Sequence, residues 1–183
     1  GTIQDDSLQE DLNALGIDHN TSGWQLGHDV AIHGDLIALS APYAEGESGL
    51  VLIFKRIGNN QWQYEALITR ESVSGESSTP QDFFGYAIAL HDDLLVIGSP
   101  NVEFQNIDYH GAAYVFRRVQ AGDWQHVATL NESLANDPLH GTQFQDARFG
   151  WSVDIQGGVI AVGQPGALGL TQDYFTGRGT AWV

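Results

Sequence analysis

The chain contains no cysteine, and this absence excludes disulfide bonds and thiolate chemistry. At 183 residues the chain is long enough to bury a sizeable core without such cross-links. Lysine and arginine are scarce, 7 residues against 23 aspartates and glutamates, and the formal net charge is −16. Nucleic acids and anionic membranes attract clustered Lys and Arg, so we expect neither as a partner.

Long hydrophobic runs are also missing. No apolar stretch approaches the roughly 20 residues of a membrane-spanning helix, so we expect no membrane insertion. Glycine, in contrast, is abundant, with 22 residues. Many glycines between short apolar runs indicate many turns, which favours an all-β fold.

A 17-residue stretch occurs three times without a gap. Its copies are LGHDVAIHGDLIALSAP (26–42), FGYAIALHDDLLVIGSP (84–100) and FGWSVDIQGGVIAVGQP (149–165). In each copy a glycine lies 15 residues before the closing proline, and the apolar positions between them coincide. An alternating run, a short polar turn and a second aliphatic run predict a β-hairpin.

Two further strands are predicted after each hairpin. A third strand begins at Gly49, Gly111 and Gly179, and a fourth begins near Trp62 and Trp124, which we interpret as blade-packing residues. The repeats start 58 and then 65 residues apart. Four antiparallel strands repeated at this period predict the blades of a β-propeller. A β-sandwich is the alternative, but it does not account for a gap-free repeat.

The Phe-Gly pairs, together with the GSP and GQP endings, resemble the FG-GAP repeats of integrin α-subunit propellers and of secreted bacterial proteins. The segment GAAYVFRR, followed by Trp124, is especially similar to the bacterial repeats. The resemblance extends over nearly the whole chain. It implies a β-propeller that is secreted or lies at the cell surface, but it implies little about a ligand, since propellers have many functions.

The repeats divide the chain into three blade units, at about 24–69, 82–130 and 147–183. The third unit lacks a fourth strand, and residues 2–10 have the spacing of an outer strand for a neighbouring or partner blade. Three blades cannot close a ring, because propellers typically need about four to eight. Two hypotheses stay open: a head-to-tail homodimer forms a six-bladed ring, or the chain is part of a longer protein with further repeats.

Integrin-type repeats hold calcium on an Asp-rich loop between the first two strands of a blade, and the resemblance would imply such sites here. In this chain the loop is only a short turn: residues 33–35 offer one carboxylate, and residues 91–93 offer two that point apart. We therefore predict no cofactor and no metal site, with calcium on scattered loop acids as the open alternative. No zinc-type histidine spacing, nucleophile elbow or phosphate-binding loop is present.

Candidate binding residues lie in the loops between the second and third strands, because binding residues concentrate in loops on rigid scaffolds. The aromatic residues there do not repeat from blade to blade, so blade packing does not account for them. The candidates, with their polar neighbours, are Tyr43, Phe104, Asp108, Tyr109, His110, Asp173, Tyr174, Phe175 and Arg178. Packing within their own loops is the alternative. Tyr86 and Trp151 do repeat, directly after a strand-one glycine, and we assign them to blade faces or the central channel.

The pattern as a whole favours a non-catalytic, extracellular module that binds a protein or carbohydrate ligand through one face of the propeller. An enzyme domain acting on polysaccharide or phosphoester is the second hypothesis, and it requires a pocket with convergent histidines and carboxylates. A structural assembly unit is the third, and it requires that the loop aromatics be buried.

Overall fold

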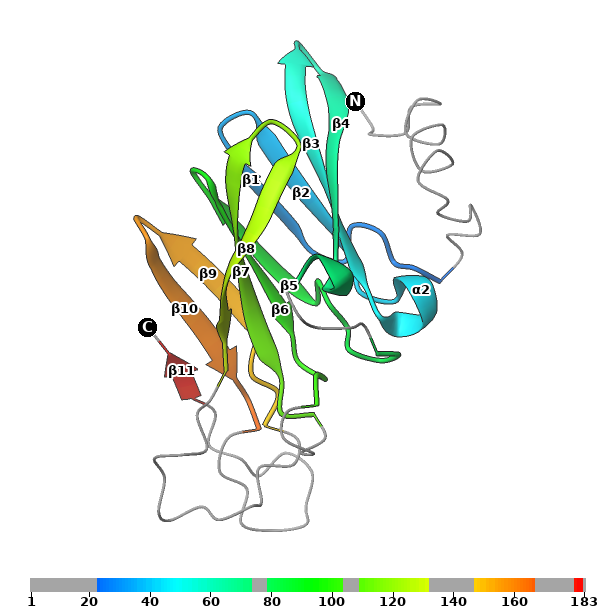
Figure 1. Cartoon of the computed structure of the whole chain (residues 1–183), viewed down its shortest axis with the longest axis vertical. Coiled ribbons are helices and arrows are strands. Elements are labelled where there is room, and N and C mark those ends of the chain that lie inside the picture. The colour runs from blue at the N-terminus through cyan, green and yellow to red at the C-terminus, as the bar shows by residue number, and fades with distance from the viewer. Residues whose placement is uncertain (1–22, 74–78, 104–108, 132–146, 167–179, 183) are drawn as a thin grey trace.

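The computed structural model describes residues 23–73, 79–103, 109–131, 147–166 and 180–182, which form three antiparallel β-sheets (Figure 1). The first sheet has the order β1-β2-β3-β4, with β1 at Val30–His33, β2 at Leu36–Ala41, β3 at Leu50–Gly58 and β4 at Gln61–Thr69. The second has the order β5-β6-β7-β8, at Ala87–His91, Leu94–Ser99, Ala112–Gln120 and Asp123–Leu130. The third contains β9 at Ser152–Gln156, β10 at Val159–Gln164 and β11 at Thr180–Trp182, with β10 in the middle.

The predicted fold class is confirmed, because helical structure in these residues is limited to two single turns, α2 at Ala44–Glu47 and the 3₁₀ turn η1 at Arg70–Ser72. The 17-residue repeat forms the first two strands of each sheet. The pairs that close the three hairpins are His33–Leu36, His91–Leu94 and Gln156–Val159. Each turn therefore contains two residues, the shorter of the two lengths, two or three residues, that the sequence allows.

Irregularities in the sheets also repeat. The ladder between β3 and β4 shifts register after Ile53 and again after Arg56. The ladder between β7 and β8 shifts after Val115 and after Arg118, the equivalent positions of the second sheet. Bulges increase the local twist of a strand pair, so both sheets acquire the same added twist near their outer edge.

The three sheets are arranged as neighbouring propeller blades. Their first strands lie together, with β5 in contact with β1 on one side and β9 on the other, while β4 and β8 form the outer edges (Figure 1). The apolar core lies between the blades. One cluster joins Val51 and Ile53 of the first sheet to Leu95 and Ile97 of the second, and another joins the second sheet to the third. The three sheets formed by the described residues do not close into a ring.

Main-chain contacts join each blade to the next, and we call this joint the interblade latch. The amide of Phe84 donates to the carbonyl of Ser48 at 3.1 Å, and the amide of Phe149 donates to the carbonyl of His110 at 2.9 Å. The residues preceding these two phenylalanines bond in the same way to residues 47 and 109. Gly111, which precedes β7, pairs with Phe149 as a parallel bridge.

The latch explains why glycine recurs before the third strand. A Cβ atom at Gly49 would overlap the carbonyl oxygen of Phe84, and one at Gly111 would overlap that of Phe149. Both phenylalanine side chains are buried: Phe84 is 0% exposed and Phe149 is 3% exposed. The phenylalanine of each Phe-Gly pair is thus a core residue, and its backbone lies so close to the glycine before the third strand that no side chain fits at that glycine.

A charged pair joins the outer parts of the first two blades. The guanidinium of Arg118 on β7 donates two hydrogen bonds to the carboxylate of Glu65 on β4, at 2.6 and 2.8 Å. The Glu65 side chain is only 6% exposed. Burial opposes its ionisation, but hydrogen bonds from Arg118 and from the backbone of Gly122 outweigh that effect and hold the pKa of Glu65 below its usual value.

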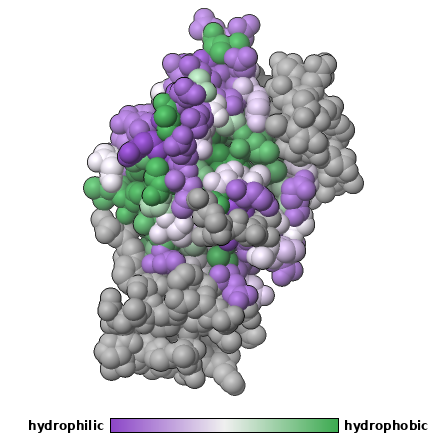
Figure 2. All heavy atoms as spheres, viewed as in Figure 1, coloured by the Kyte–Doolittle hydropathy of each residue, from purple (hydrophilic) through white to green (hydrophobic). Residues whose placement is uncertain are grey.

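The predicted outer strand at residues 2–10 lies outside the described residues. Within the described part of the third blade there are three strands. In the view of Figure 2, hydrophobic residues gather over the middle of the described part, and hydrophilic residues dominate the end formed by β3 and β4. Of the three apolar clusters in the described residues, two join neighbouring blades, and the third, which includes Leu50, Leu52 and Phe54, lies within the first blade.

Candidate functional site

Five rings contact one another across the three blades, and we call them the aromatic row: His28, Tyr43, Phe83, Tyr86 and Trp151. Ring centroids lie 5.0 Å apart for Tyr43 and Phe83, and 4.7 Å apart for Tyr86 and Trp151. His28 is exposed, and the other four side chains are half-buried. The row therefore spans neighbouring blades while leaving part of each ring open to solvent.

Three turns of equal geometry position the row, at residues 25–28, 83–86 and 148–151. In each, the amide of the last residue donates to the carbonyl of the first, at 2.8, 3.0 and 3.2 Å. The first residue of each turn has a left-handed φ: 54° for Gln25, 54° for Phe83 and 57° for Arg148. Left-handed φ values are uncommon for residues other than glycine, and they cluster where a protein fixes side chains for binding.

These turns place the last residue of each, His28, Tyr86 and Trp151, at the start of the innermost strand of its blade. Tyr43 reaches the row from the loop after β2, and its ring contacts both His28 and Phe83. The row is thus made where the loop after a second strand meets the link into the next blade. Loop residues held this way on a rigid sheet are well suited to binding.

Arg148 adds positive charge at one end of the row. Its guanidinium carbon lies 5.4 Å from the ring centroid of Trp151 and 5.9 Å from that of Tyr109. Both distances are within the range of a cation–π interaction. Burial raises the pKa of Tyr86, and the neighbouring Tyr43 adds to this rise, while Arg148 opposes it. Tyr86 consequently remains a neutral phenol, able to donate a hydrogen bond, at neutral pH.

The predicted binding residues fall into two groups. Six of them, Phe104, Asp108, Asp173, Tyr174, Phe175 and Arg178, lie outside the described residues. Of the remaining three, Tyr43 belongs to the aromatic row, and Tyr109 lies beside Arg148 with 38% of its surface exposed. His110 is completely buried, and its backbone forms part of the interblade latch.

The sequence prediction did not single out most of the aromatic row. Tyr86 and Trp151, which the sequence places on blade faces or at the central channel, have their rings in equivalent positions on successive blades and in contact with each other. Phe83 and Arg148 could have been recognised by their shared position directly before the Phe-Gly pair. Most residues of the aromatic row therefore occupy positions that repeat from blade to blade, whereas the sequence prediction concentrated on loop aromatics that do not repeat.

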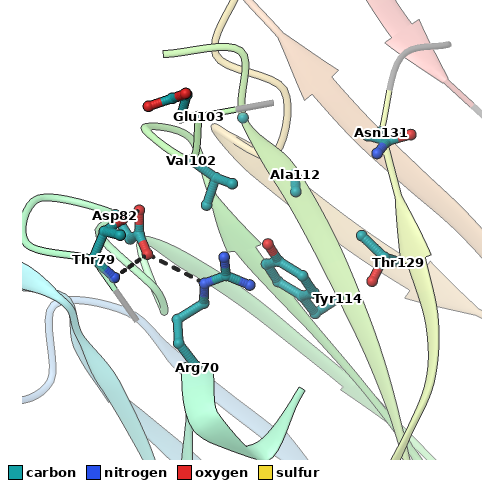
Figure 3. A pocket seen from close by; sticks show the side chains of 10 residues that line it. Arg70, Thr79, Asp82, Val102, Glu103, Ala112, Tyr114, Thr129 and Asn131 are labelled. Atoms are coloured by element: carbon teal, nitrogen blue, oxygen red, sulfur yellow. Dashed lines mark hydrogen bonds and ion pairs between the residues drawn. The ribbon is translucent and has the colours of Figure 1, made fainter. Parts of the chain in front are cut away.

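A pocket of about 400 Å³ lies between the first two blades (Figure 3). Its described lining residues are Arg70, Thr79, Asp82, Val102, Glu103, Gly111, Ala112, Tyr114, Thr129 and Asn131. The Arg70 guanidinium points toward the Tyr114 ring, 4.7 Å from its centroid (Figure 3).

Two of the charged groups that line this pocket, Arg70 and Asp82, already bind each other. Asp82 accepts hydrogen bonds from the backbone and hydroxyl of Thr79, at 2.9 and 2.5 Å, and from Arg70 Nε at 3.2 Å. Asp82 and Arg70 are 2% and 5% exposed. A carboxylate paired in this way stabilises the link between blades and is a poor general base. No histidine is among the described residues that line the pocket.

The turn at residues 91–93 does not bring its two carboxylates together. Asp92 contacts His33 Nε2 at 3.0 Å, while Asp93 pairs with Arg117 at 3.3 Å. Across the described ranges, no three His, Cys, Asp or Glu side chains gather in a way that could hold a metal ion. No helix in these ranges has the length and apolar character needed to cross a membrane.

Comparison with known proteins gives one match. Residues 76–116 match the FG-GAP repeat family. This segment includes the link into the second blade, the hairpin β5–β6 and β7 as far as Phe116. No curated protein matches the chain. The match falls on the copy of the repeat with the landmarks Phe84-Gly85 and Gly98-Ser99-Pro100, so the central segment of this chain is an FG-GAP repeat.

Proposed function

We propose that the chain is a non-catalytic binding module that acts outside the cell, and that the aromatic row is the surface that meets its protein or glycan ligand. The observation that carries this proposal is the row itself: partly exposed rings from three successive blades in mutual contact. Tyr, Trp and Arg are the residues most enriched among those that dominate binding energy.

The rigidity of the row supports the same proposal. Three hydrogen-bonded turns hold the rings in place, so little side-chain freedom remains to be lost when a ligand binds. The half-buried rings also offer apolar surface together with a polar group, as the phenol of Tyr86 does. An extracellular location is supported by the FG-GAP match, because these repeats are typically extracellular.

An enzymatic role has weaker support. In the pocket between the first two blades, the buried charged groups Arg70 and Asp82 already pair with each other. Its described lining includes no histidine beside Asp82 to act as a proton carrier. A binding role needs no such group, since shape and aromatic contact are sufficient for recognition.

The test compares three proteins on a glycan array and in a pull-down from extracellular fluid, followed by affinity measurement on the ligand found. These are the unmodified chain, Trp151→Ala and the control Val119→Ala. Val119 is 58% exposed on β7 and takes no part in the row. We expect Trp151→Ala to weaken binding by more than about tenfold, and Val119→Ala to leave it unchanged. Equal losses in both variants, or hydrolysis of an array component with no binding, would contradict the proposal.

A further inference from the structure

The middle of the aromatic row lies on the second blade, which has a neighbouring blade on each side. Tyr86 directly precedes β5, and β5 contacts β1 on one side and β9 on the other. Its ring contacts His28, Phe83 and Trp151 and is nevertheless only half-buried. The surface that the row presents at Tyr86 is therefore a property of the joined blades.

Rings in the row are inclined to one another rather than coplanar. The ring planes of Tyr43 and Phe83 meet at 48°, and those of Tyr86 and Trp151 meet at 49°. Successive ring centroids are 5.0, 6.4 and 4.7 Å apart in the order Tyr43, Phe83, Tyr86, Trp151. An inclined pair presents the face of one ring beside the edge of the other. A compact proline ring packs against such a pair, whereas a flat sugar ring needs the open face of a single aromatic ring.

Three polar groups at the Trp151 end of the row can donate hydrogen bonds. The Arg148 guanidinium and the Trp151 indole can only donate, and the Tyr86 phenol stays neutral and can donate as well. The carboxylate of Asp29, which follows His28 of the row, already accepts from two backbone amides, at 2.9 and 2.8 Å. A ligand that supplies acceptors without donors therefore matches this end of the row, whereas sugar hydroxyls also need acceptors for their own protons.

Charge narrows the choice of ligand further. The guanidinium carbon of Arg148 lies 5.4 Å from the ring centroid of Trp151, so a second cation placed on this ring would meet the repulsion of a like charge. The formal net charge of −16 disfavours a polyanionic ligand. An uncharged ligand avoids both penalties.

We propose that the aromatic row binds an uncharged, proline-rich polypeptide segment in the polyproline II conformation, an inference that rests on the binding function proposed above. Such a segment has no internal hydrogen bonds and its prolines carry no N–H, so it offers carbonyl acceptors to the donors of the row. It rises about 3.1 Å per residue, so the ring-to-ring steps of 4.7 to 6.4 Å correspond to about 1.5 to 2 residues of the ligand. The segment and the row are both ordered before they meet, which keeps the entropic cost of association low.

The experiment titrates the chain with an end-blocked decaproline peptide, which forms the polyproline II helix in water, and follows binding by isothermal titration calorimetry. A glycine–serine peptide of the same length is the control ligand. We expect saturable binding of decaproline to the unmodified chain and to Val119→Ala, and no binding of the glycine–serine peptide. Circular dichroism establishes that each variant is folded.

Two variants of the row locate the binding site. Trp151→Ala should weaken decaproline binding by more than about tenfold. Tyr86→Phe keeps the ring and removes only the hydroxyl donor, so it should weaken binding by about three- to tenfold. If Trp151→Ala does not fold, Tyr86→Phe decides the result alone, because the loss of one hydroxyl leaves the packing of the ring in place.

The outcomes separate this inference from the proposed function. Failure of decaproline to bind, or binding that the two row variants leave unchanged, would overturn the inference. An array glycan that binds through Trp151 while decaproline does not bind would also overturn it, but would support the proposed function. If no glycan, captured protein or peptide binds in a way that depends on Trp151, both the inference and the proposed function are wrong.

Discussion

The interblade latch predicts that Gly111→Ala destabilises the protein through a contact between blades rather than within one. The backbone φ at this glycine is +83°, a conformation that costs an alanine about 1–2 kcal/mol. The new methyl group would also overlap the carbonyl oxygen and amide nitrogen of Phe149. These are main-chain atoms, so no flexible side chain can move aside to relieve the overlap.

The expected loss in the free energy of unfolding is the sum of the backbone term and two terms that arise from the overlap. Separating the blades enough to admit a methyl group costs about 1–3 kcal/mol, as other overpacked cores do. Stretching the bond from the Phe149 amide to the His110 carbonyl adds about 1 kcal/mol. With the backbone term of about 1–2 kcal/mol, the free energy of unfolding should fall by about 3–6 kcal/mol, a large part of the roughly 5–15 kcal/mol typical of folded proteins.

Gly157→Ala is the matched control. Its φ is +57°, but no atom lies within 4 Å of the position its Cβ would occupy. This variant should therefore lose only the backbone term of about 1–2 kcal/mol. The unfolding of both variants by urea is followed by intrinsic tryptophan fluorescence. Their unfolding free energies are compared through the denaturation midpoints, with the same dependence of free energy on urea concentration for both. If the two alanines cost the same, the close approach of Gly111 to Phe149 does not hold the blades together.

Two other predictions concern the interfaces between blades. The folded pKa of Glu65 lies below its usual value, so the contribution of Glu65 to stability is complete above the unfolded pKa and is lost as the pH falls through the folded pKa. In that acidic range the unmodified chain should lose stability more steeply than Glu65→Gln, as followed by thermal unfolding at a series of pH values. Parallel curves for the two proteins would exclude this role of Glu65. Ile97→Ala removes a completely buried side chain between the first two blades and should lower the free energy of unfolding, measured by urea titration, by about 2–5 kcal/mol. Val119→Ala, at an exposed position, is the control and should change this free energy by less than about 0.5 kcal/mol.

The sequence predicts the hairpins well because their determinants are local. Alternation, a short polar turn and a closing proline lie within a 17-residue stretch and predict a hairpin, which the structure closes with the pair His91–Leu94. The bulges after Ile53 and Val115 leave no comparable mark, since a bulge depends on how two strands twist against each other. The contact of Arg118 with Glu65 spans 53 positions and two blades, so only the stacking of the sheets reveals it.

The aromatic row shows a different limit of prediction from the sequence. Its residues are visible in the sequence, but their common direction depends on a left-handed residue at the start of each turn, such as Phe83 and Arg148. Gln25, Phe83 and Arg148 share no chemistry that would mark this conformation in advance. Repetition alone could indicate either packing or a surface array, and the half-exposed rings of Tyr86 and Trp151 decide in favour of the surface.

Because the latch consists of main-chain hydrogen bonds, its geometry does not depend on which side chains its residues carry. Glu47 and Tyr109 accept the same bond in successive blades, and so do Ser48 and His110, although these side chains differ in charge, size and polarity. Of these four residues Glu47 and Tyr109 are partly exposed, so substitutions there can change the surface of the loop while the joint between blades keeps its geometry. Each added copy of such a unit therefore brings its own joint to the neighbouring blade, while the sequence of its loop can vary.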